Sequence, residues 1–249
     1  RHYYTERVIY LPDSYQPNDA NRKISNLDTT RSDFGLPSNA TVLCCFNNTA
    51  KIGTEELKIW LKIMLRFPHT VLWLFKSNAL AEKNLCKAVK DMGVDPNRVI
   101  FAHPLPHASH LSRHKHADLF LDTFNYNAHT TASDALWSGL PVVTKKGRQF
   151  AARVASSLLC AAELPDLIAT SSSEYEEKII ELLDNPTKLD GIRQKLSKNL
   201  TAVPLFDSAR YIRAFEAGLK AAVDRVNAGK KPDDIWVRSL SALTMKQYS

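Results

Sequence analysis

The amino-acid sequence predicts a protein of the α/β class, built on a doubly wound parallel sheet with helices on both faces. Two observations support this prediction. Short apolar runs recur between residues 41 and 144, and the stretches between them show the apolar spacing of helices. The runs are apolar at nearly every position, as in strands that are buried on both faces of a parallel sheet. Together these patterns favour a Rossmann-like arrangement.

Five strands are expected, each a run of apolar and β-branched residues bounded by polar residues or turns. TVLCCF begins the series, and LPVVT, which directly follows a glycine, ends it. The expected strands cover residues 41–46, 70–75, 98–102, 117–123 and 140–144.

Helices are expected between the strands. EELKIWLKIMLRF has apolar residues three and four positions apart, and the next helix ends at Gly93, a residue type that favours helix C-termini. From Ser173 onward the chain is helical, and its last, amphipathic segment ends near Gly229. The expected helices before Ser173 cover residues 55–67, 82–93 and 131–139.

The pattern divides the chain into three parts. Residues 37–229 are expected to form the α/β lobe with its C-terminal helices. Residues 1–36 contain a short apolar run, RVIYLP, and then a polar stretch expected to be a linker. Residues 230–249 are expected to be a polar tail. No window approaches the roughly 18 uninterrupted apolar residues of a transmembrane span, so no membrane partner is expected.

Composition and missing motifs exclude several classes of protein. The formal net charge is +7, but the basic residues are spread along the chain without a zinc finger or basic arm. No nucleic-acid partner is therefore expected, whereas a small ligand with phosphate groups is plausible. The absence of GxGxxG, Walker, GxSxG and HExxH sequences argues against dehydrogenases, P-loop enzymes, serine hydrolases and zinc proteases. The four cysteines lack metal-ligand spacing and are expected to be buried free thiols in a reducing, cytoplasmic compartment.

The stretch HTTASDALW places two threonines at the start of the helix that precedes the last expected strand. In such sheets ligands bind beyond the carboxyl ends of the strands, where a helix N-terminus offers free N–H groups to phosphate oxygens. Thr130 and Thr131 would add hydroxyl groups to that site. The alternative is a capping box with Thr131 as N-cap and Asp134 as N3, which needs no ligand. The residues alone leave both interpretations open.

A second polar cluster, FNNTAKI, follows the first expected strand. Asn47, Asn48 and Lys51 would lie at the same edge of the sheet as the helix start. Lys51 could supply a positive charge to a phosphate group. The alternative is an asparagine-rich turn with a surface lysine, and for this cluster taken alone it is the better explanation.

Five of the eight histidines lie in HPLPHASHLSRHKH, which follows the third expected strand. On a helix that begins near Pro106, residues His107, His110 and His114 would share one face, a spacing that could suit a metal. The segment holds no acidic residue or cysteine, so no metal site is expected. A loop that recognises a nucleotide base is the better functional interpretation, and ordinary surface histidines are the alternative.

Together, FNNTAKI, LPHASH, LDTFNYNAHTTASDALWSGLPVVT and RVASSLL resemble the carboxyl-terminal half of the O-GlcNAc transferase family, glycosyltransferase family 41, which includes plant SPINDLY proteins. VIYLPDSYQPND resembles the bacterial branch of that family. The resemblance covers about residues 3–228 and implies the donor-binding lobe of a two-lobed, B-type glycosyltransferase. It also implies that residues 1–36 include the end of the first catalytic lobe. The remainder of that lobe, and tetratricopeptide repeats, would then lie outside this chain.

The resemblance implies a role for each matching residue. Lys51 would neutralise the diphosphate of a nucleotide-sugar donor and is the catalytic residue expected in this chain. Thr130 and Thr131 would hold the pyrophosphate, and Asp134 would bind the ribose hydroxyls. The other implied donor contacts are Asn48, His129, the backbone of Leu105, and His107 and His110 at the base.

The identity of the donor is left open by Asn48, which stands where animal members have glutamine and SPINDLY-type proteins have asparagine. UDP-GlcNAc is the expected donor, and GDP-fucose or another hexose donor is the alternative. A basic loop after the fifth strand is a weaker candidate for acceptor or phosphate contact. It contains Lys145, Lys146 and Arg148.

The implied reaction is displacement at the anomeric carbon of the sugar by a protein serine or threonine hydroxyl, with inversion and without metal or other cofactor. The general base would belong to the first lobe, so this chain alone is expected to bind nucleotide weakly and not to turn over. Two other classes stay open. A non-hydrolysing sugar-nucleotide epimerase would need an acidic pair that the motifs lack, and a scaffold module would keep the lobe without activity.

Overall fold

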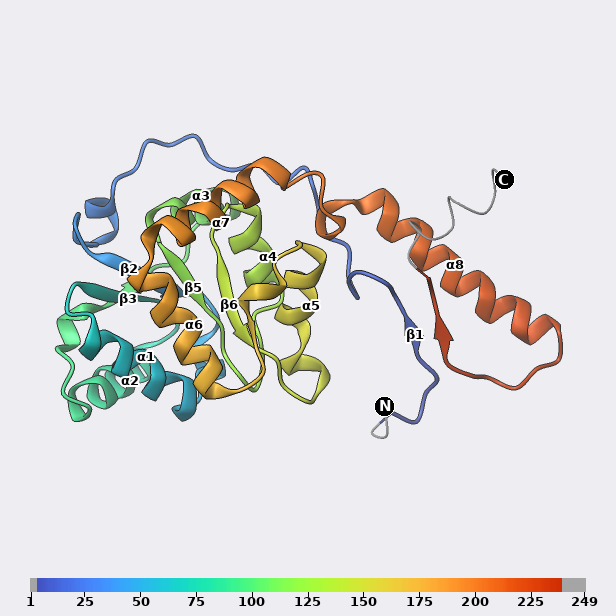
Figure 1. The fold of residues 1–249 in the computed structure, drawn as a ribbon, viewed down its shortest axis with the longest axis horizontal. Helices are drawn as coiled ribbons and strands as arrows, with labels where there is room; N and C mark the ends of the chain where they lie inside the picture. Colours follow the sequence, from blue (N-terminus) through green and yellow to red (C-terminus); the bar gives the residue numbers. More distant parts are fainter. Residues whose placement is uncertain (1–3, 239–249) are drawn as a thin grey trace.

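The computed structural model describes residues 4–238, and its centre is a six-stranded parallel sheet (Figure 1). The strand order is β4-β3-β2-β5-β6-β7, so the chain builds one half of the sheet outward from β2 and then returns to build the other half. This doubly wound order confirms the predicted fold class. The strands are β2 (Thr41–Cys45), β3 (Thr70–Phe75), β4 (Val99–Ala102), β5 (Leu119–Leu121), β6 (Val142–Lys145) and β7 (Ile168–Ala169).

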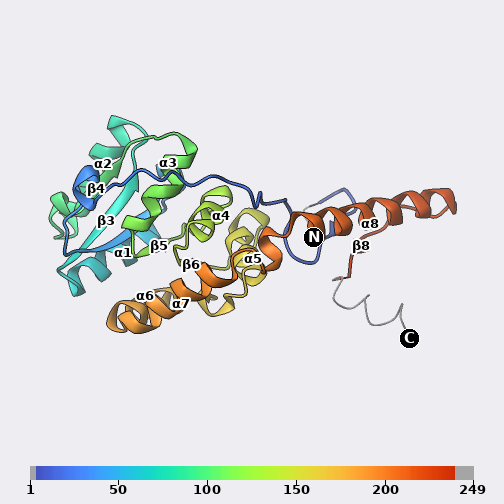
Figure 2. The ribbon, with the colours of Figure 1, turned by 90° about the horizontal axis from the view of Figure 1, so that it is seen from above.

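The helices form two groups that flank the sheet (Figure 2): α1 packs beside α6 and α7 on one side, and α3, α4 and α5 pack in series on the other. None of the helices in the described part of the chain is both long and apolar enough to cross a membrane. The helices are α1 (Thr54–Arg66), α2 (Ala79–Asp91), α3 (His107–Arg113), α4 (Thr130–Trp137), α5 (Val154–Ala161), α6 (Ser172–Asp184), α7 (Pro186–Asn199) and α8 (Ser208–Asn227).

Most predicted elements are confirmed within a few residues, and the differences have local causes. Helix α2 begins at Ala79 rather than residue 82, because the side chain of Asn78 accepts a hydrogen bond from the amide of Ala81 (2.9 Å) and caps the helix earlier. Helix α5 and the two-residue strand β7 were not among the expected elements.

The sheet is buried on both faces. Residues 42–45 of β2 are completely inaccessible, although successive strand residues point to opposite faces. Between α1 and α6, the indole of Trp60 donates a hydrogen bond to the hydroxyl of Tyr175 (3.1 Å). All four cysteines are free thiols. The prediction that they are buried holds for the two in β2 and is wrong for Cys86, which is half-buried, and for Cys160, which is exposed.

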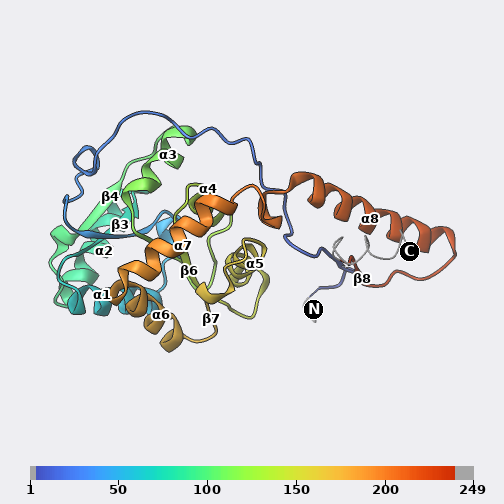
Figure 3. The same ribbon diagram turned by 45° about the horizontal axis from the view of Figure 1, so that its top comes forward.

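Residues 13–36, named the strap, run across the outside of the lobe before the chain enters β2 (Figures 1 and 3). The amide of Ser25 donates a hydrogen bond to the carbonyl of Ala108 in α3 (3.0 Å). The hydroxyl of Thr29 lies 2.9 Å from Nε2 of His116. The stretch that the sequence predicted to be a linker is therefore a segment held against the lobe.

Helix α8 extends away from the sheet, and the two ends of the described chain pack along it (Figure 1). Strand β1 (Ile9–Tyr10) pairs in parallel with β8 (Ile235–Trp236). A Cβ atom on Gly218 of α8 would lie 2.6 Å from Cγ2 of Ile9, so the close approach requires glycine. We name α8, β1 and β8 the arm.

The arm corrects one sequence prediction. Residues 230–249 were expected to be a polar tail, but β8 within them pairs with β1. The sequence did not predict this strand, because two residues are too few to show a periodic pattern. Residues 239–249 of that expected tail, like residues 1–3 of the expected first part, lie outside the described residues.

Candidate functional site

The carboxyl ends of β2 and β5 lie side by side, at the point where the strand order changes direction. Open α/β sheets bind ligands in the crevice at such a point. The segments that leave β2, β4 and β5 all contribute side chains there, and we name this edge of the sheet the rim. The three segments are residues 46–52, 103–110 and 122–130.

Asp122 fixes the shape of the loop between β5 and α4. Its carboxylate is fully buried and accepts hydrogen bonds from the amides of Thr123 (2.8 Å) and Ala128 (2.6 Å). The hydroxyl of Thr144 also donates to it (2.6 Å). Burial raises the pKa of Asp122 to about 7, even though these hydrogen bonds favour the charged form. Asp122 therefore acts inside the protein, below the surface of the rim.

Asn47 connects this loop to the start of α4. Its amide nitrogen donates to the hydroxyl of Thr123 (2.8 Å), and its amide oxygen accepts from the hydroxyl of Thr131 (2.7 Å). The predicted capping box is therefore wrong. The N-cap is His129, and its side chain makes no capping hydrogen bond. Within the described residues, the amides of Thr130 and Thr131 have no hydrogen-bond acceptor, so this helix N-terminus can receive an anion.

Lys51 ends a short 3-10 helix, Thr49–Lys51, that follows β2. Its ammonium group donates to the carbonyl of Asn127 (3.2 Å) and lies 3.9 Å from the ring centroid of Tyr126. Burial lowers the pKa of Lys51, and Asp122 opposes that shift. No carboxylate in the described residues lies within 4.0 Å of this ammonium group, so its charge is available to a ligand.

His129 stands beside Lys51 in an aromatic cluster. Its ring stacks on Tyr126 (centroids 4.8 Å apart), and its Nδ1 lies 3.3 Å from the hydroxyl of Tyr15 in the strap. Burial is the main reason that the pKa of His129 is lowered, and the charge of Lys51 lowers it further. Sequence reasoning missed Tyr15 and Tyr126. The available signal was that both lie inside quoted motifs: Tyr126 in the one around the helix start and Tyr15 in VIYLPDSYQPND.

Helix α3 brings two of the predicted histidines to the rim. His107 Nε2 lies 3.4 Å from a carboxylate oxygen of Asp134. His110 packs edge-on against Phe46 (centroids 5.5 Å apart), and burial lowers its pKa to about 3, so its ring is neutral at physiological pH. Leu105 is exposed at the start of this segment, as a backbone contact to a ligand would require.

Two other histidines of the segment, His114 and His116, serve the fold. His114 is buried with Nδ1 2.8 Å from the carbonyl of His110, and His116 contacts the strap. Among the described residues, no group of three His, Cys, Asp or Glu side chains is arranged to hold a metal ion.

Asp134 does not face the rim as a free carboxylate. Its side chain is 7% exposed, and its Oδ1 forms an ion pair with Nη1 of Arg22 at 2.6 Å. Arg22 belongs to the strap, and Nη2 of the same guanidinium donates to the hydroxyl of Ser133 (3.2 Å). Sequence reasoning missed Arg22, because it lies in a polar stretch more than a hundred residues from its partner and without any periodic pattern.

Two other predicted residues are turned toward the protein itself. The side chain of Asn48 accepts a hydrogen bond from the amide of Ala50 (3.0 Å) and caps the 3-10 helix. Lys145 donates to the side chains of Ser172 (3.0 Å) and Glu55 (3.3 Å). Lys145 is thus neutralised within the chain, which leaves the basic loop after β6 a weaker candidate than Lys51.

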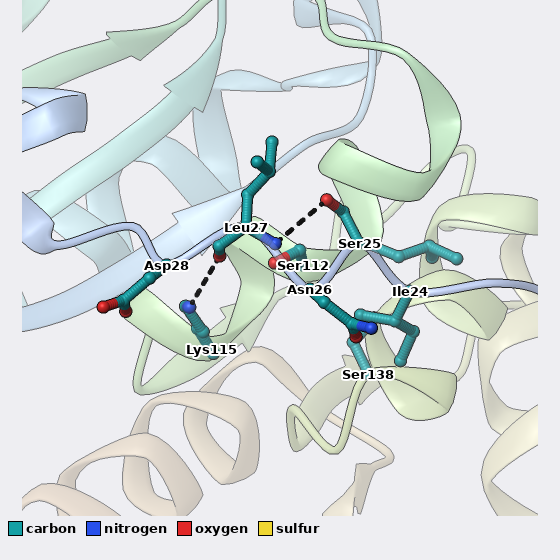
Figure 4. Close-up of a pocket in the computed structure, with 9 residues that line it drawn as sticks. Ile24, Ser25, Asn26, Leu27, Asp28, Ser112, Lys115 and Ser138 are labelled. Atoms are coloured by element: carbon teal, nitrogen blue, oxygen red, sulfur yellow. Dashed lines mark hydrogen bonds between the residues drawn. The ribbon is translucent and has the colours of Figure 1, made fainter.

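A separate cavity of about 390 Å³ lies behind α3, between that helix and the strap (Figure 4). In the close-up, Lys115 reaches toward the carbonyl of Leu27, and Asn26 points toward Ser138. The cavity shares no residue with the rim, and it is bordered by Ile24, Ser25, Asn26, Leu27, Asp28, Leu111, Ser112, Lys115 and Ser138.

Comparison with known proteins gives one consistent family. Residues 12–215 match the family described as Glycosyl transferase family 41. The chain is 35% identical over 221 residues to the probable UDP-N-acetylglucosamine--peptide N-acetylglucosaminyltransferase SEC of Arabidopsis thaliana, covering 86% of this chain and 23% of that protein. It is 35% identical over 211 residues to the UDP-N-acetylglucosamine--peptide N-acetylglucosaminyltransferase of Caenorhabditis elegans, covering 85% of this chain and 18% of that protein. The chain thus spans about a fifth of the length of these curated relatives.

Among solved structures, a mutant of the Thermobaculum terrenum O-GlcNAc transferase matches with a TM-score of 0.73 and 30% sequence identity. The match covers 86% of this chain and 40% of that one. The residues that match the family, 12–215, include the strap, the rim and the first part of α8. The sheet and the segments that form the site therefore all lie within the family region.

Proposed function

Because the chain belongs to glycosyl transferase family 41, we propose that it is the donor-binding lobe of an inverting transferase that moves GlcNAc from UDP-GlcNAc to serine or threonine hydroxyls of proteins. The observation that carries the proposal is the ammonium group of Lys51 at the rim, which has no carboxylate partner among residues 4–238. It lies beside an uncapped helix N-terminus, and the loop that links them is held in place by Asp122.

The diphosphate of the donor fits between Lys51 and the start of α4. The amides of Thr130 and Thr131, which have no acceptor among the described residues, would donate hydrogen bonds to phosphate oxygens, and the positive end of the helix dipole would favour their charge. When the bond to the sugar breaks, negative charge develops on the leaving diphosphate, and a fixed ammonium group stabilises it without reorganisation. His129, whose ring is held between Tyr15 and Tyr126, forms the adjacent wall.

The base and ribose fit toward α3. The backbone of Leu105, an exposed residue, and the side chain of His107 would contact the base edge, and the neutral ring of His110 offers a surface for stacking. Asp134, held by Arg22, would accept hydrogen bonds from the ribose hydroxyls. Asn48 would contact the donor only if its side chain left the turn that it caps.

The remaining parts of the reaction would come from outside this chain. The attacking hydroxyl needs a positioned base, which we assign to the first catalytic lobe, and tetratricopeptide repeats would present the protein acceptor. No metal or other cofactor is required if Lys51 and the helix N-terminus stabilise the leaving group. We expect a cytoplasmic enzyme, and we expect the isolated chain to bind nucleotide weakly without turnover.

The test compares two lysines of the same edge in the full-length protein. Lys51→Met should weaken UDP-GlcNAc binding at least about tenfold and lower kcat about a hundredfold, because a charge aimed at the leaving group is lost. Lys145→Met is the matched control, since Lys145 also lies over an aromatic ring (3.8 Å from the centroid of Phe124) but is paired with Glu55. Equal effects of the two substitutions on calorimetric affinity and on kcat would refute the assignment of Lys51.

A titration with UDP, UDP-GlcNAc, GDP and GDP-fucose tests the donor. Tighter binding of GDP than of UDP would replace the UDP-GlcNAc assignment by GDP-fucose. Binding of neither nucleotide would favour a scaffold module that retains the lobe without its ligand.

A further inference from the structure

We propose that Arg22 is a positioning residue for nucleotide recognition: it holds the Asp134 carboxylate so that one oxygen is committed to the strap and the other accepts the ribose hydroxyls. This inference rests on the proposed function, since it needs a ribose at the rim. It assigns to the strap, a segment outside the sheet, a direct influence on which nucleotides the lobe accepts.

Arg22 is itself held rigidly. Its Nε donates to the carbonyl of Asp19 (2.9 Å), and its guanidinium lies 5.1 Å from the ring centroid of Trp137 and 5.3 Å from that of Phe206. The indole of Trp137 donates to the carbonyl of Arg22 (3.1 Å). The side chain of Arg22 is 10% exposed. An arginine with its backbone, its Nε and its ring contacts all fixed can determine the position of a partner.

The guanidinium of Arg22 bonds two neighbouring side chains at the start of α4. Nη1 of Arg22 bonds Oδ1 of Asp134 (2.6 Å), while Nη2 bonds the hydroxyl of the neighbouring Ser133 (3.2 Å). His107 Nε2 approaches the same Oδ1 at 3.4 Å. Within the described residues Oδ2 has no hydrogen-bond partner, so one carboxylate oxygen remains for a ligand.

The chemistry of a ribose suits the carboxylate of Asp134. A ribose offers vicinal hydroxyl groups, which donate hydrogen bonds most strongly to an ionised carboxylate. A carboxylate that is almost fully buried loses most of its hydration, and a cation or several hydrogen-bond donors must compensate for that loss. Arg22 supplies that charge from the strap. Without it, Asp134 would be a poorer and less well-oriented acceptor, although no atom that touches the nucleotide had changed.

The experiment measures a ratio of affinities in the full-length protein: the Kd of 2′,3′-dideoxy-UDP divided by the Kd of UDP. Wild type should prefer UDP by about tenfold or more, the usual value of a hydrogen bond to a charged group. Arg22→Gln should bring the ratio to within about twofold of one. Arg22→Lys should give an intermediate ratio, because lysine restores the charge but cannot bond Asp134 and Ser133 together.

Arg31→Gln is the matched control. Arg31 also joins the strap to the lobe, through an ion pair of 2.9 Å with Asp118, but at the opposite edge of the sheet. Arg31→Gln should lower the melting temperature and leave the ratio of the two Kd values unchanged. If Arg22→Gln weakens UDP and dideoxy-UDP by the same factor, Arg22 only supports the fold and the inference is wrong. If wild type itself binds both nucleotides equally, the ribose assignment of the proposed function fails first, and the role of Arg22 fails with it.

Discussion

The two edges of the central sheet both carry charged side chains, but they differ in how Arg98 and Asp118 at one edge and Lys51 at the other are compensated. At the amino edge, Arg98 donates to three backbone carbonyls and one hydroxyl at 2.8–3.0 Å. Asp118 at the same edge accepts from Arg31 (2.9 Å) and from the amide of Val42 (2.7 Å). Each of these charges is satisfied by a fixed partner, as expected for groups that stabilise the fold.

At the rim the buried layer is equally well satisfied, but the layer above it is not. Asp122 accepts several hydrogen bonds, whereas the ammonium group of Lys51 contacts a carbonyl and an aromatic ring. Within residues 4–238 no carboxylate pairs with Lys51, and the N-cap side chain of α4 makes no capping hydrogen bond. The two edges of the sheet therefore have different roles. Polar groups that are satisfied internally hold the structure, and those left without a counter-charge are available for a ligand.

The largest expected effect concerns the buried layer of the rim. Asp122→Ala should lower the free energy of unfolding by roughly 3–5 kcal/mol, because several buried donors lose their acceptor at once. Urea denaturation monitored by circular dichroism measures this loss. Asp122→Asn keeps one acceptor oxygen and should cost less than half as much. Equal losses in both variants would show that the carboxylate is not the centre of this network.

A smaller loss is expected at the amino edge. Arg98→Ala should lower the free energy of unfolding by about 2 kcal/mol, since backbone carbonyls near β3 lose their donor. Nucleotide affinity, measured in parallel by calorimetry, should stay within twofold of wild type. A marked loss of nucleotide affinity in this variant would contradict the distinction between the two edges, because it would show that a residue of the amino edge affects binding at the rim.

The raised pKa of Asp122 predicts a pH dependence of stability. Its folded value of about 7 exceeds its ordinary value of 3.8, so the folded protein holds this proton more tightly than the unfolded chain does. The resulting stabilisation is complete below about pH 4 and is lost as the pH rises through 7. The slope for one such group is on the order of 1 kcal/mol per pH unit.

The measurement compares wild type with Asp122→Asn between pH 4 and 8. His110 and His114, whose pKa values burial lowers to about 3 and about 4, make both proteins less stable as the pH falls below 6.5. That contribution cancels in the difference. The advantage of wild type over the variant should shrink as the pH rises, and a difference that is independent of pH would contradict the assignment.

The smallest expected effect concerns the exposed layer of the rim. Lys51→Met should leave the free energy of unfolding unchanged or raise it by up to about 1 kcal/mol, because burial disfavours the charge of this lysine. Thermal unfolding without nucleotide measures the change. A loss of more than about 1 kcal/mol would mean that Lys51 holds the fold, in contrast to its proposed role.

The sheet and the segments at its rim could be predicted from the sequence, because buried parallel strands leave continuous apolar runs and the loops after them follow by topology. The contacts of the strap could not be. Arg22 and Asp134 are far apart in the chain, and nothing local to either residue indicates the other. The capping box failed for a related reason: Thr131 fits the local pattern, but its hydroxyl is bound by Asn47, which belongs to another loop.

The pairing of β1 with β8 has a consequence for the order of folding. The amide of Val8 donates to the side chain of Asp234 (3.0 Å), a contact that spans 226 positions and closes a loop around the entire lobe. Closing so long a loop costs more chain entropy than any contact within the sheet, and the strand pair that closes it is only two residues long. The arm should therefore assemble last and open first, with the amides of Ile235 and Val237 exchanging with solvent hydrogen well before those of β2.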